Sequence, residues 1–203
     1  SDRAKSSTVL EGTSINVDIT APGALLALAL LYLKSRDRSV AVRIDIPDTT
    51  FAFQYIRPDL VLLRVLAKNL ILWDDIQPTA AWIEGHVPVV MTGVKAQLGR
   101  EIDSGDVQQT LRQGYFNVLT GACLSIGFRF AGTAHTAAKH LLTQYLQYMI
   151  KLQRSKFDRA DKNMLEYCMN SVALALSLVM SGTGHLGTFK YFSIRLIWQT
   201  SFH

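Results

Sequence analysis

Two adjacent carboxylates, Asp74 and Asp75, come closest in this sequence to an acid–base or metal-binding pair. Neighbouring residues on a helix do not face each other, so the two carboxylates are not placed to act on one atom. No histidine or cysteine accompanies them at close spacing. We therefore expect both to be solvated residues at the end of a helix.

Two histidines, His135 and His185, each follow a Gly-Thr pair and lie 50 residues apart. A metal site needs several ligands that converge on one ion. Recurrence at equivalent positions instead favours a role in capping the helix that follows each turn. We assign no metal ligand.

The segment Gly182–Gly187 matches the Gly-x-Gly-x-x-Gly pattern of dinucleotide-binding loops. That fingerprint needs a preceding strand and a βαβ unit, whereas the residues before it have the composition of a helix. Nucleophile-elbow, Walker and His-Glu-x-x-His motifs are absent from the sequence. The aromatic side chains are interpreted as packing residues, namely Tyr145, Tyr148, Phe189, Tyr191 and Phe192. The sequence thus predicts no enzyme, no catalytic residue, no cofactor and no small-molecule substrate.

The bulk composition favours a folded domain in a reducing compartment. Hydrophobic residues make up 49% of the 203 residues, and Cys123 and Cys168 have no Cys-x-x-Cys spacing. The charge, 21 basic minus 16 acidic or +5, is scattered along the chain. We therefore expect no nucleic-acid partner, because such sites cluster their basic residues. The nucleus and cytoplasm are the expected location.

A membrane span needs about 20 apolar residues, and the purest apolar run, 22–33, has twelve. No membrane association is expected, although a helical fragment of a membrane protein remains an alternative. Residues 1–13 are polar and are predicted to be a flexible N-terminal segment.

Internal repeats organise the rest of the chain. Residues 121–135 align without a gap with 171–185, and four positions are identical at an offset of 50: Leu124/Leu174, Gly132/Gly182, Thr133/Thr183 and His135/His185. A third copy begins at Gly23, and its turn reads Lys34-Ser35-Arg36-Asp37 without the Gly-Thr pair.

Each copy predicts a helix, a tight turn and a second helix. The first helix is apolar nearly all round, as in a helix enclosed by neighbours, and glycine can adopt the left-handed conformation that ends it. Second helices are expected over 137–152 and 184–198. The structural repeat positions are Gly23, Ala24, Gly121, Ala122, Gly127, Gly132, Thr133, Gly182, Thr183 and Gly184.

The predicted fold class is all-α, a solenoid of helical hairpins. The first part spans 14–87 and includes a plainer hairpin, with helices from Asp59 to Trp73 and from Thr79 to Gly85. Residues 88–106 are predicted to be a linker or insertion, and 107–203 form the second part. Alternation over 40–46 indicates a short extended piece.

The pattern Gly121-Ala122-x-Leu124-Ser125-Ile126-Gly127, closed by Gly132-Thr133, resembles the proteasome/cyclosome repeat. Residues 14–24, 70–76 and 123–131 are similar to the anaphase-promoting complex subunit 1 branch of that family, instead of the proteasome base branch, which remains the alternative. The last copy departs from the pattern, because Ser171-Val172 replaces Gly-Ala.

This resemblance implies a closed ring of helical hairpins with more repeats than this chain contains. It also implies a non-catalytic scaffold in a multi-subunit ubiquitin ligase that controls mitosis. The implied partners are the other subunits of the complex and the coactivators that the scaffold helps to position.

Overall fold

The computed structural model describes residues 17–54, 56–98, 105–154 and 159–185, and every regular element in these ranges is a helix. This confirms the predicted all-α class. The predicted flexible segment 1–13 lies outside the described residues, and so does the expected helix over 184–198 beyond residue 185.

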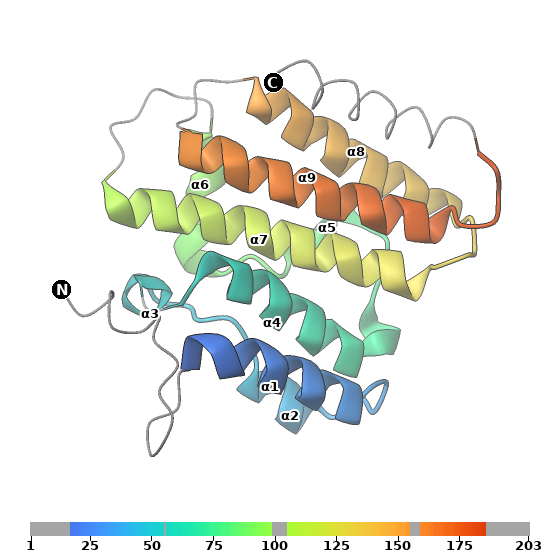
Figure 1. The fold of residues 1–203 in the computed structure, drawn as a ribbon, viewed down its shortest axis with the longest axis horizontal. Coiled ribbons are helices and arrows are strands. Elements are labelled where there is room, and N and C mark those ends of the chain that lie inside the picture. The colour runs from blue at the N-terminus through green and yellow to red at the C-terminus, as the bar shows by residue number, and fades with distance from the viewer. Residues whose placement is uncertain (1–16, 55, 99–104, 155–158, 186–203) are drawn as a thin grey trace.

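Four helices form a row in chain order: α1 (Val17–Leu31), α4 (Pro58–Ile71), α7 (Asp106–Arg129) and α9 (Arg159–Val179). They lie side by side and run in nearly the same direction (Figure 1), and each packs against the next. The plainer hairpin of the sequence therefore supplies a full member of the row, α4. The predicted helix from Asp59 to Trp73 corresponds to α4, but the sequence did not mark it as a copy of the repeat because its turn lacks the Gly-Thr pair.

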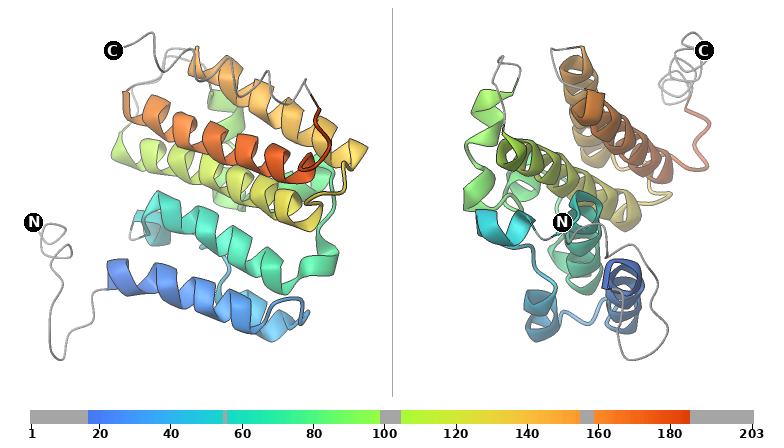
Figure 2. Two further views of the ribbon diagram at one scale, coloured as in Figure 1. Left: turned by 45° about the vertical axis from the view of Figure 1, so that its right-hand side comes forward. Right: turned by 60° about the vertical axis from the view of Figure 1, so that its left-hand side comes forward.

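A second layer covers one side of this row and returns the chain between its members. It consists of α8 and several short helices, which Figures 1 and 2 show behind the row. The elements of this layer are α2 (Arg38–Arg43), α3 (Thr50–Gln54), η2 (Trp73–Asp75), α5 (Ala80–Glu84), η3 (Val89–Met91), α6 (Val94–Gln97) and α8 (Thr136–Gln153).

The main hydrophobic core surrounds α7. Every residue from Gly114 to Gly127 is buried, because α4 and α9 pack on either side and the second layer covers the back. A smaller cluster joins α1, α2 and α4 around Ala29 and Ile71. The apolar composition of α7 is thus explained by its enclosure.

Side-chain caps set where two of the short helices, α2 and α5, begin. Asp37 Oδ1 accepts hydrogen bonds from the backbone N–H groups of Ser39 (2.9 Å) and Val40 (3.2 Å), and so begins α2. The extended piece expected over 40–46 is therefore wrong, since the cap selects a helix there. Thr79 Oγ1 accepts in the same way from the Trp82 N–H and begins α5, as the sequence predicts.

The predicted linker, 88–106, needs correction for its first part. It contains η3 and α6, and its residues Met91 and Val94 are buried in the core. Met91 reaches α7 at Gly114, where an added Cβ would lie 2.5 Å from the Met91 methyl carbon. The glycines of this segment obscured a short stretch that packs against α7. Residues 99–104 lie outside the described residues.

Candidate functional site at the repeat junctions

The turns after α7 and α9 have the same conformation. Gly132 and Gly182 have left-handed φ angles of 69° and 78°, and the residues two positions later are left-handed too. The hydroxyls of Thr133 and Thr183 donate hydrogen bonds of 2.7 Å to the carbonyl oxygens three residues before them. The two copies recognised in the sequence therefore fold alike.

The turn after α1 has this conformation without glycine. Its residues Lys34 and Arg36 correspond to Gly132 and Ala134 of the copy at 121–135, and they have φ angles of 59° and 61°. A left-handed conformation costs a non-glycine residue about 1–2 kcal/mol. The side chains offset this cost, because the Lys34 ammonium lies 4.6 Å from the centre of the Trp73 ring and Arg36 binds Asp74.

These turns also join neighbouring helices of the row. Backbone N–H groups of Lys34 and Arg36 donate to the Leu70 and Ile71 carbonyl oxygens of α4, at 3.0 and 3.1 Å. After α7, the N–H groups of Gly132 and Ala134 donate to the Leu178 and Val179 carbonyl oxygens of α9, at 2.8 and 3.0 Å. We call each such pair of hydrogen bonds a backbone clasp. Each clasp satisfies carbonyl groups that a helix end leaves without partners.

Two glycines of α7 allow close approach on opposite sides. An added Cβ at Gly121 would lie 2.7 Å from the Leu62 carbonyl oxygen of α4. An added Cβ at Gly127 would lie 2.6 Å from the Ala175 Cα of α9. Both glycines of the repeat pattern are therefore packing positions, one toward each neighbour.

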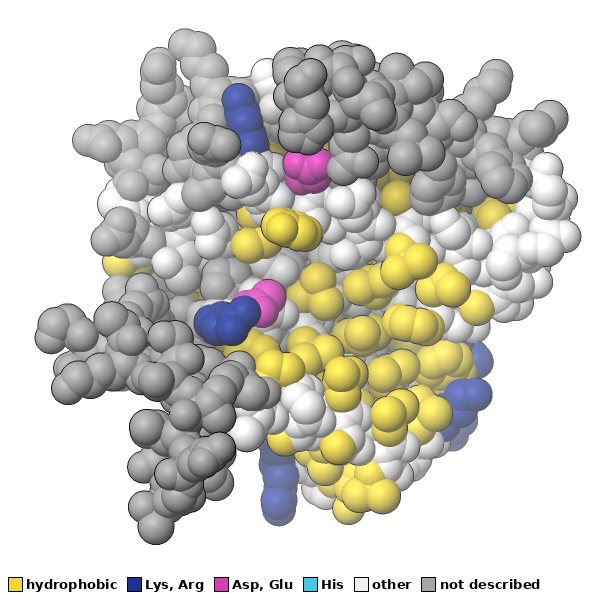
Figure 3. Space-filling model, in the orientation of Figure 1, with side chains coloured by type: hydrophobic (Ala, Val, Ile, Leu, Met, Phe, Trp, Pro, Cys, Tyr) yellow, Lys and Arg dark blue, Asp and Glu magenta, His cyan; other side chains and the backbone are white. Residues whose placement is uncertain are grey.

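The face of α1 that corresponds to the Gly121 side of α7 is uncovered. Gly23, Ala24 and Ala27 are exposed, whereas their counterparts at 121, 122 and 125 are buried. No atom lies within 4 Å of a Cβ built on Gly23. Leu30 and Leu31, farther along α1, are 63% and 78% exposed, and hydrophobic side chains gather over α1 and α4 in Figure 3.

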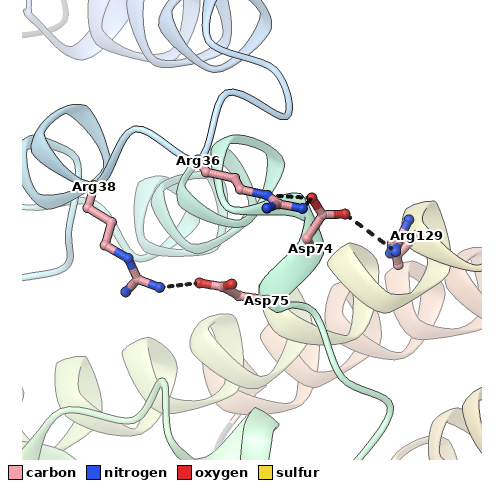
Figure 4. Close-up of polar contacts among 5 residues, drawn as sticks. All are labelled: Arg36, Arg38, Asp74, Asp75 and Arg129. Carbon is pink, nitrogen blue, oxygen red and sulfur yellow. Dashed lines mark hydrogen bonds and ion pairs between the residues drawn. The ribbon is translucent and has the colours of Figure 1, made fainter.

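The acidic pair, Asp74 and Asp75, forms ion pairs with arginines of other elements. Asp74 lies between two arginines, Arg36 of the turn after α1 and Arg129 at the end of α7 (Figure 4). Asp75 pairs with Arg38 at 2.9 Å. The hydrogen bond from Arg36 holds the pKa of the Asp74 carboxyl below its ordinary value. All five residues of these contacts are at least partly exposed.

A buried polar link, which the sequence did not reveal, connects α4 with α7 and the segment after α5. Asn69 Nδ2 donates to Ser125 Oγ at 3.2 Å, and Asn69 Oδ1 lies 3.1 Å from His86 Nε2. His86 Nδ1 lies 2.8 Å from the Trp82 carbonyl oxygen. Burial lowers the pKa of the His86 imidazole. The asparagine alone, in an apolar helix, could have signalled this link.

The other candidate groups do not converge on a site. His135 Nδ1 accepts from the Ala138 N–H and caps α8, while His185 Nε2 lies 2.9 Å from Lys139 Nζ. Cys123 and Cys168 are buried, and burial raises the pKa of the Cys168 thiol to about 11. Across the described ranges, no three His, Cys, Asp or Glu residues are grouped to hold a metal ion.

The Gly-x-Gly-x-x-Gly match follows helix α9 and not a strand, and its described residues, 182–185, belong to the turn after α9. Tyr145 and Tyr148 pack against the core, whereas Phe189, Tyr191 and Phe192 lie outside the described residues. None of the described helices has both the length and the apolarity to span a bilayer.

Comparison with known proteins decides the family. The family model described as APC1 fifth domain matches residues 1–200. The chain belongs to the anaphase-promoting complex subunit 1 family. It is 38% identical to anaphase-promoting complex subunit 1 of Arabidopsis thaliana and 40% identical to that of Homo sapiens, over 93% and 88% of this chain. It is also 38% identical, over 86% of its length, to a protein of Emericella nidulans named negative regulator of mitosis.

The chain spans 12%, 9% and 8% of the lengths of these three relatives, or about a tenth. The matched region of the subunit 1 family thus corresponds to the row of helices and its second layer. The resemblance read from residues 14–24, 70–76 and 123–131 is confirmed at the level of the family.

Proposed function

We propose that this chain is a non-catalytic scaffold segment of the largest subunit of the anaphase-promoting complex, a multi-subunit ubiquitin ligase that controls mitotic progression. Its role is to support subunit assembly and to help position coactivators, in the nucleus and cytoplasm. The names of the relatives support membership in that complex. Its partners are other subunits and coactivators, with no nucleic acid, membrane, cofactor or small-molecule substrate.

The absence of a role in catalysis is supported by the use of the polar groups. The residues that could have done chemistry are engaged in holding helices together. Asp74 and Asp75 pair with arginines, and His135 caps α8. Each of these contacts positions a helix, and in the part of the chain that the structure describes no three His, Cys, Asp or Glu residues are grouped to hold a metal ion.

The observation that carries the scaffold proposal is the uncovered face of α1. Its exposed small residues, Gly23, Ala24 and Ala27, repeat the residues with which α7 packs closely on α4. We infer that this face receives another helix of the same repeat type. Stacked repeats bury a continuous core in this way and need neighbours on both sides. The closed ring implied by the resemblance stays a prediction.

Affinity capture of the whole protein that carries this chain, followed by mass spectrometry, tests the proposal. We expect the other subunits of the anaphase-promoting complex in stoichiometric amounts. Recovery of proteasome base subunits in their place would overturn it. A matched pair of variants tests the surface: Ala27→Glu on the uncovered face should reduce incorporation into the complex, whereas Val89→Glu, at a side chain that is 83% exposed on η3, should not.

A further inference from the structure

The three junctions of the row are not held in the same way at the edge where the turns lie. The α1/α4 and α7/α9 junctions each have a backbone clasp. At the α4/α7 junction, no backbone hydrogen bond joins the turn after α4 to the end of α7 among the described residues. The carbonyl groups of Phe128 and Arg129, which correspond to the acceptors Leu178 and Val179 of α9, receive none from that turn.

The conformation of the turn explains the difference. Residues 73–75 form the 3-10 helix η2, and no residue of this turn has a positive φ angle. The two clasped turns each contain two left-handed residues. At the first of them, Lys34 and Arg36 adopt this conformation in spite of the steric cost to non-glycine residues. The chain therefore keeps the clasp at α1/α4 where it is costly and lacks it at α4/α7.

Side-chain charges replace the missing clasp. Asp74 Oδ1 lies 3.5 Å from Arg129 Nη2, and the Arg129 guanidinium lies 5.6 Å from the centre of the Trp73 ring. Figure 4 shows Asp74 between Arg36 and Arg129. The side chains of Asp74 and Arg129 are each 36% exposed. Salt and anionic groups in solution can therefore weaken this contact, which they cannot do to a backbone hydrogen bond of a packed turn.

The middle of the same junction is tightly packed. Gly121 lies against the Leu62 carbonyl oxygen, with no room for a side chain. This contact fixes the centre of the α4/α7 interface, and the buried hydrogen bond from Asn69 to Ser125 fixes it one turn before Arg129. Beyond that point, the exposed charges of Asp74 and Arg129 hold the edge. Rotation about these two contacts would change the spacing at the edge, where Asp74 and Arg129 meet.

We propose that the α4/α7 junction is the hinge of this helical row, and that the ion pair between Asp74 and Arg129 is its latch. Closing the latch holds α1, α4 and α7 as one unit, because Asp74 also binds Arg36. Opening it changes the angle between α4 and α7 and so the curvature of the row. The α7/α9 junction, with its backbone clasp, does not share this response.

Electron–electron distance measurements on spin labels test the hinge in the full 203-residue chain, diluted with unlabelled chain so that only intramolecular pairs count. One labelled pair, Gln77→Cys with Ala131→Cys, spans the α4/α7 edge. A second pair, Ala131→Cys with Ser181→Cys, spans the α7/α9 edge. All three positions are exposed. The native Cys123 and Cys168 are buried and will not take the label.

We expect the first distance distribution to broaden on the order of twofold between 0.01 M and 1 M salt, as the screening length falls from roughly 30 to 3 Å. The second should stay unchanged. Asp74→Asn and Arg129→Gln should each broaden the first distribution at low salt, and Arg129→Lys, which retains the charge, should restore much of its narrowness. Asp75→Asn is the matched control, since Asp75 pairs with Arg38 and contacts no residue of α7 by an ion pair.

Equal broadening at both junctions would overturn the hinge, because it would mean a general loosening of the fold. No broadening at either junction would overturn it as well. An unchanged response in Asp74→Asn and Arg129→Gln would remove the latch. Thermal unfolding of each labelled variant, measured alongside, establishes that the chain is folded in every comparison.

Discussion

The backbone N–H of Gly132 donates a 2.8 Å hydrogen bond to the carbonyl oxygen of Leu178, 46 residues later in the chain. The donor belongs to the turn between α7 and α8, inside one repeat, and the acceptor belongs to the last turn of α9, the next helix in the row. The turn thus has two roles, since it reverses the chain and it completes the end of a neighbouring helix. The same relationship joins Lys34 to Leu70 at 3.0 Å.

Close packing at Gly121 predicts a clear difference between two equivalent glycines. Gly121→Ala should destabilise the chain by about 1–3 kcal/mol, because its Cβ would meet the Leu62 backbone and force α4 and α7 apart. Gly23→Ala should stabilise it by about 0.5–1 kcal/mol, since alanine favours a helix and open space surrounds that position. Urea unfolding measures both. Equal effects of the two substitutions would contradict the packing role.

Backbone strain at the turns predicts a second effect, separate from packing. Gly182 has a φ angle of 78° and no atom within 4 Å of an added Cβ. Gly182→Ala should therefore lower the free energy of unfolding by roughly 1–2 kcal/mol through the left-handed conformation alone. Gly93→Ala is the control, with the same open surroundings and a φ of −72°. A control effect as large as that of Gly182→Ala in thermal unfolding would reject this explanation.

The buried His86 predicts a pH dependence of stability. Its folded-state pKa is lowered by burial, so below about pH 6.5 the unfolded chain binds a proton more readily than the folded one. Its contribution to stability is present above pH 6.5 and is lost as the pH falls toward the folded-state pKa. Urea unfolding between pH 7.5 and pH 5 should show this loss, with a slope of at most about 1.4 kcal/mol per pH unit from this group.

Replacement of the histidine isolates its share. His86→Gln should flatten the pH dependence, because glutamine carries no titrating proton. His140→Gln, at an exposed position on α8, should retain the parental slope. A slope that persists unchanged in His86→Gln would assign the pH dependence to other groups.

The uncovered face of α1 predicts that the isolated chain self-associates. Exposed apolar surface of this kind drives association, and Leu30 and Leu31 lie on the same helix as the exposed small residues. In sedimentation velocity, the parent chain should show concentration-dependent species larger than a monomer. Leu30→Glu should shift the distribution toward monomer without lowering the melting temperature, whereas Val89→Glu should not. A parent chain that stays monomeric at all concentrations would contradict this prediction.

The repeats can be seen in the sequence where residues of the same type recur at the same spacing. The copies at 121–135 and 171–185 were recognisable because a helix that is enclosed on all sides consists of small and apolar residues, and because glycine readily adopts the left-handed conformation of the turn. The sequence predicted α4 as a helix of a plainer hairpin but not as a copy of the repeat, since η2 replaces the glycine turn. It also predicted a linker where Met91 packs into the core.

The sequence by itself therefore determined the helical class, the repeat unit, two glycine turns and the family. These depend on residues within one helix or turn, so their spacing along the chain records them. Only the tertiary structure decided which helices become neighbours. The clasp from Gly132 to Leu178, the link from His86 through Asn69 to Ser125, and the shared position of Asp74 all join residues from separate helices. Such contacts exist only after the row has packed, because packing alone sets the distances across it.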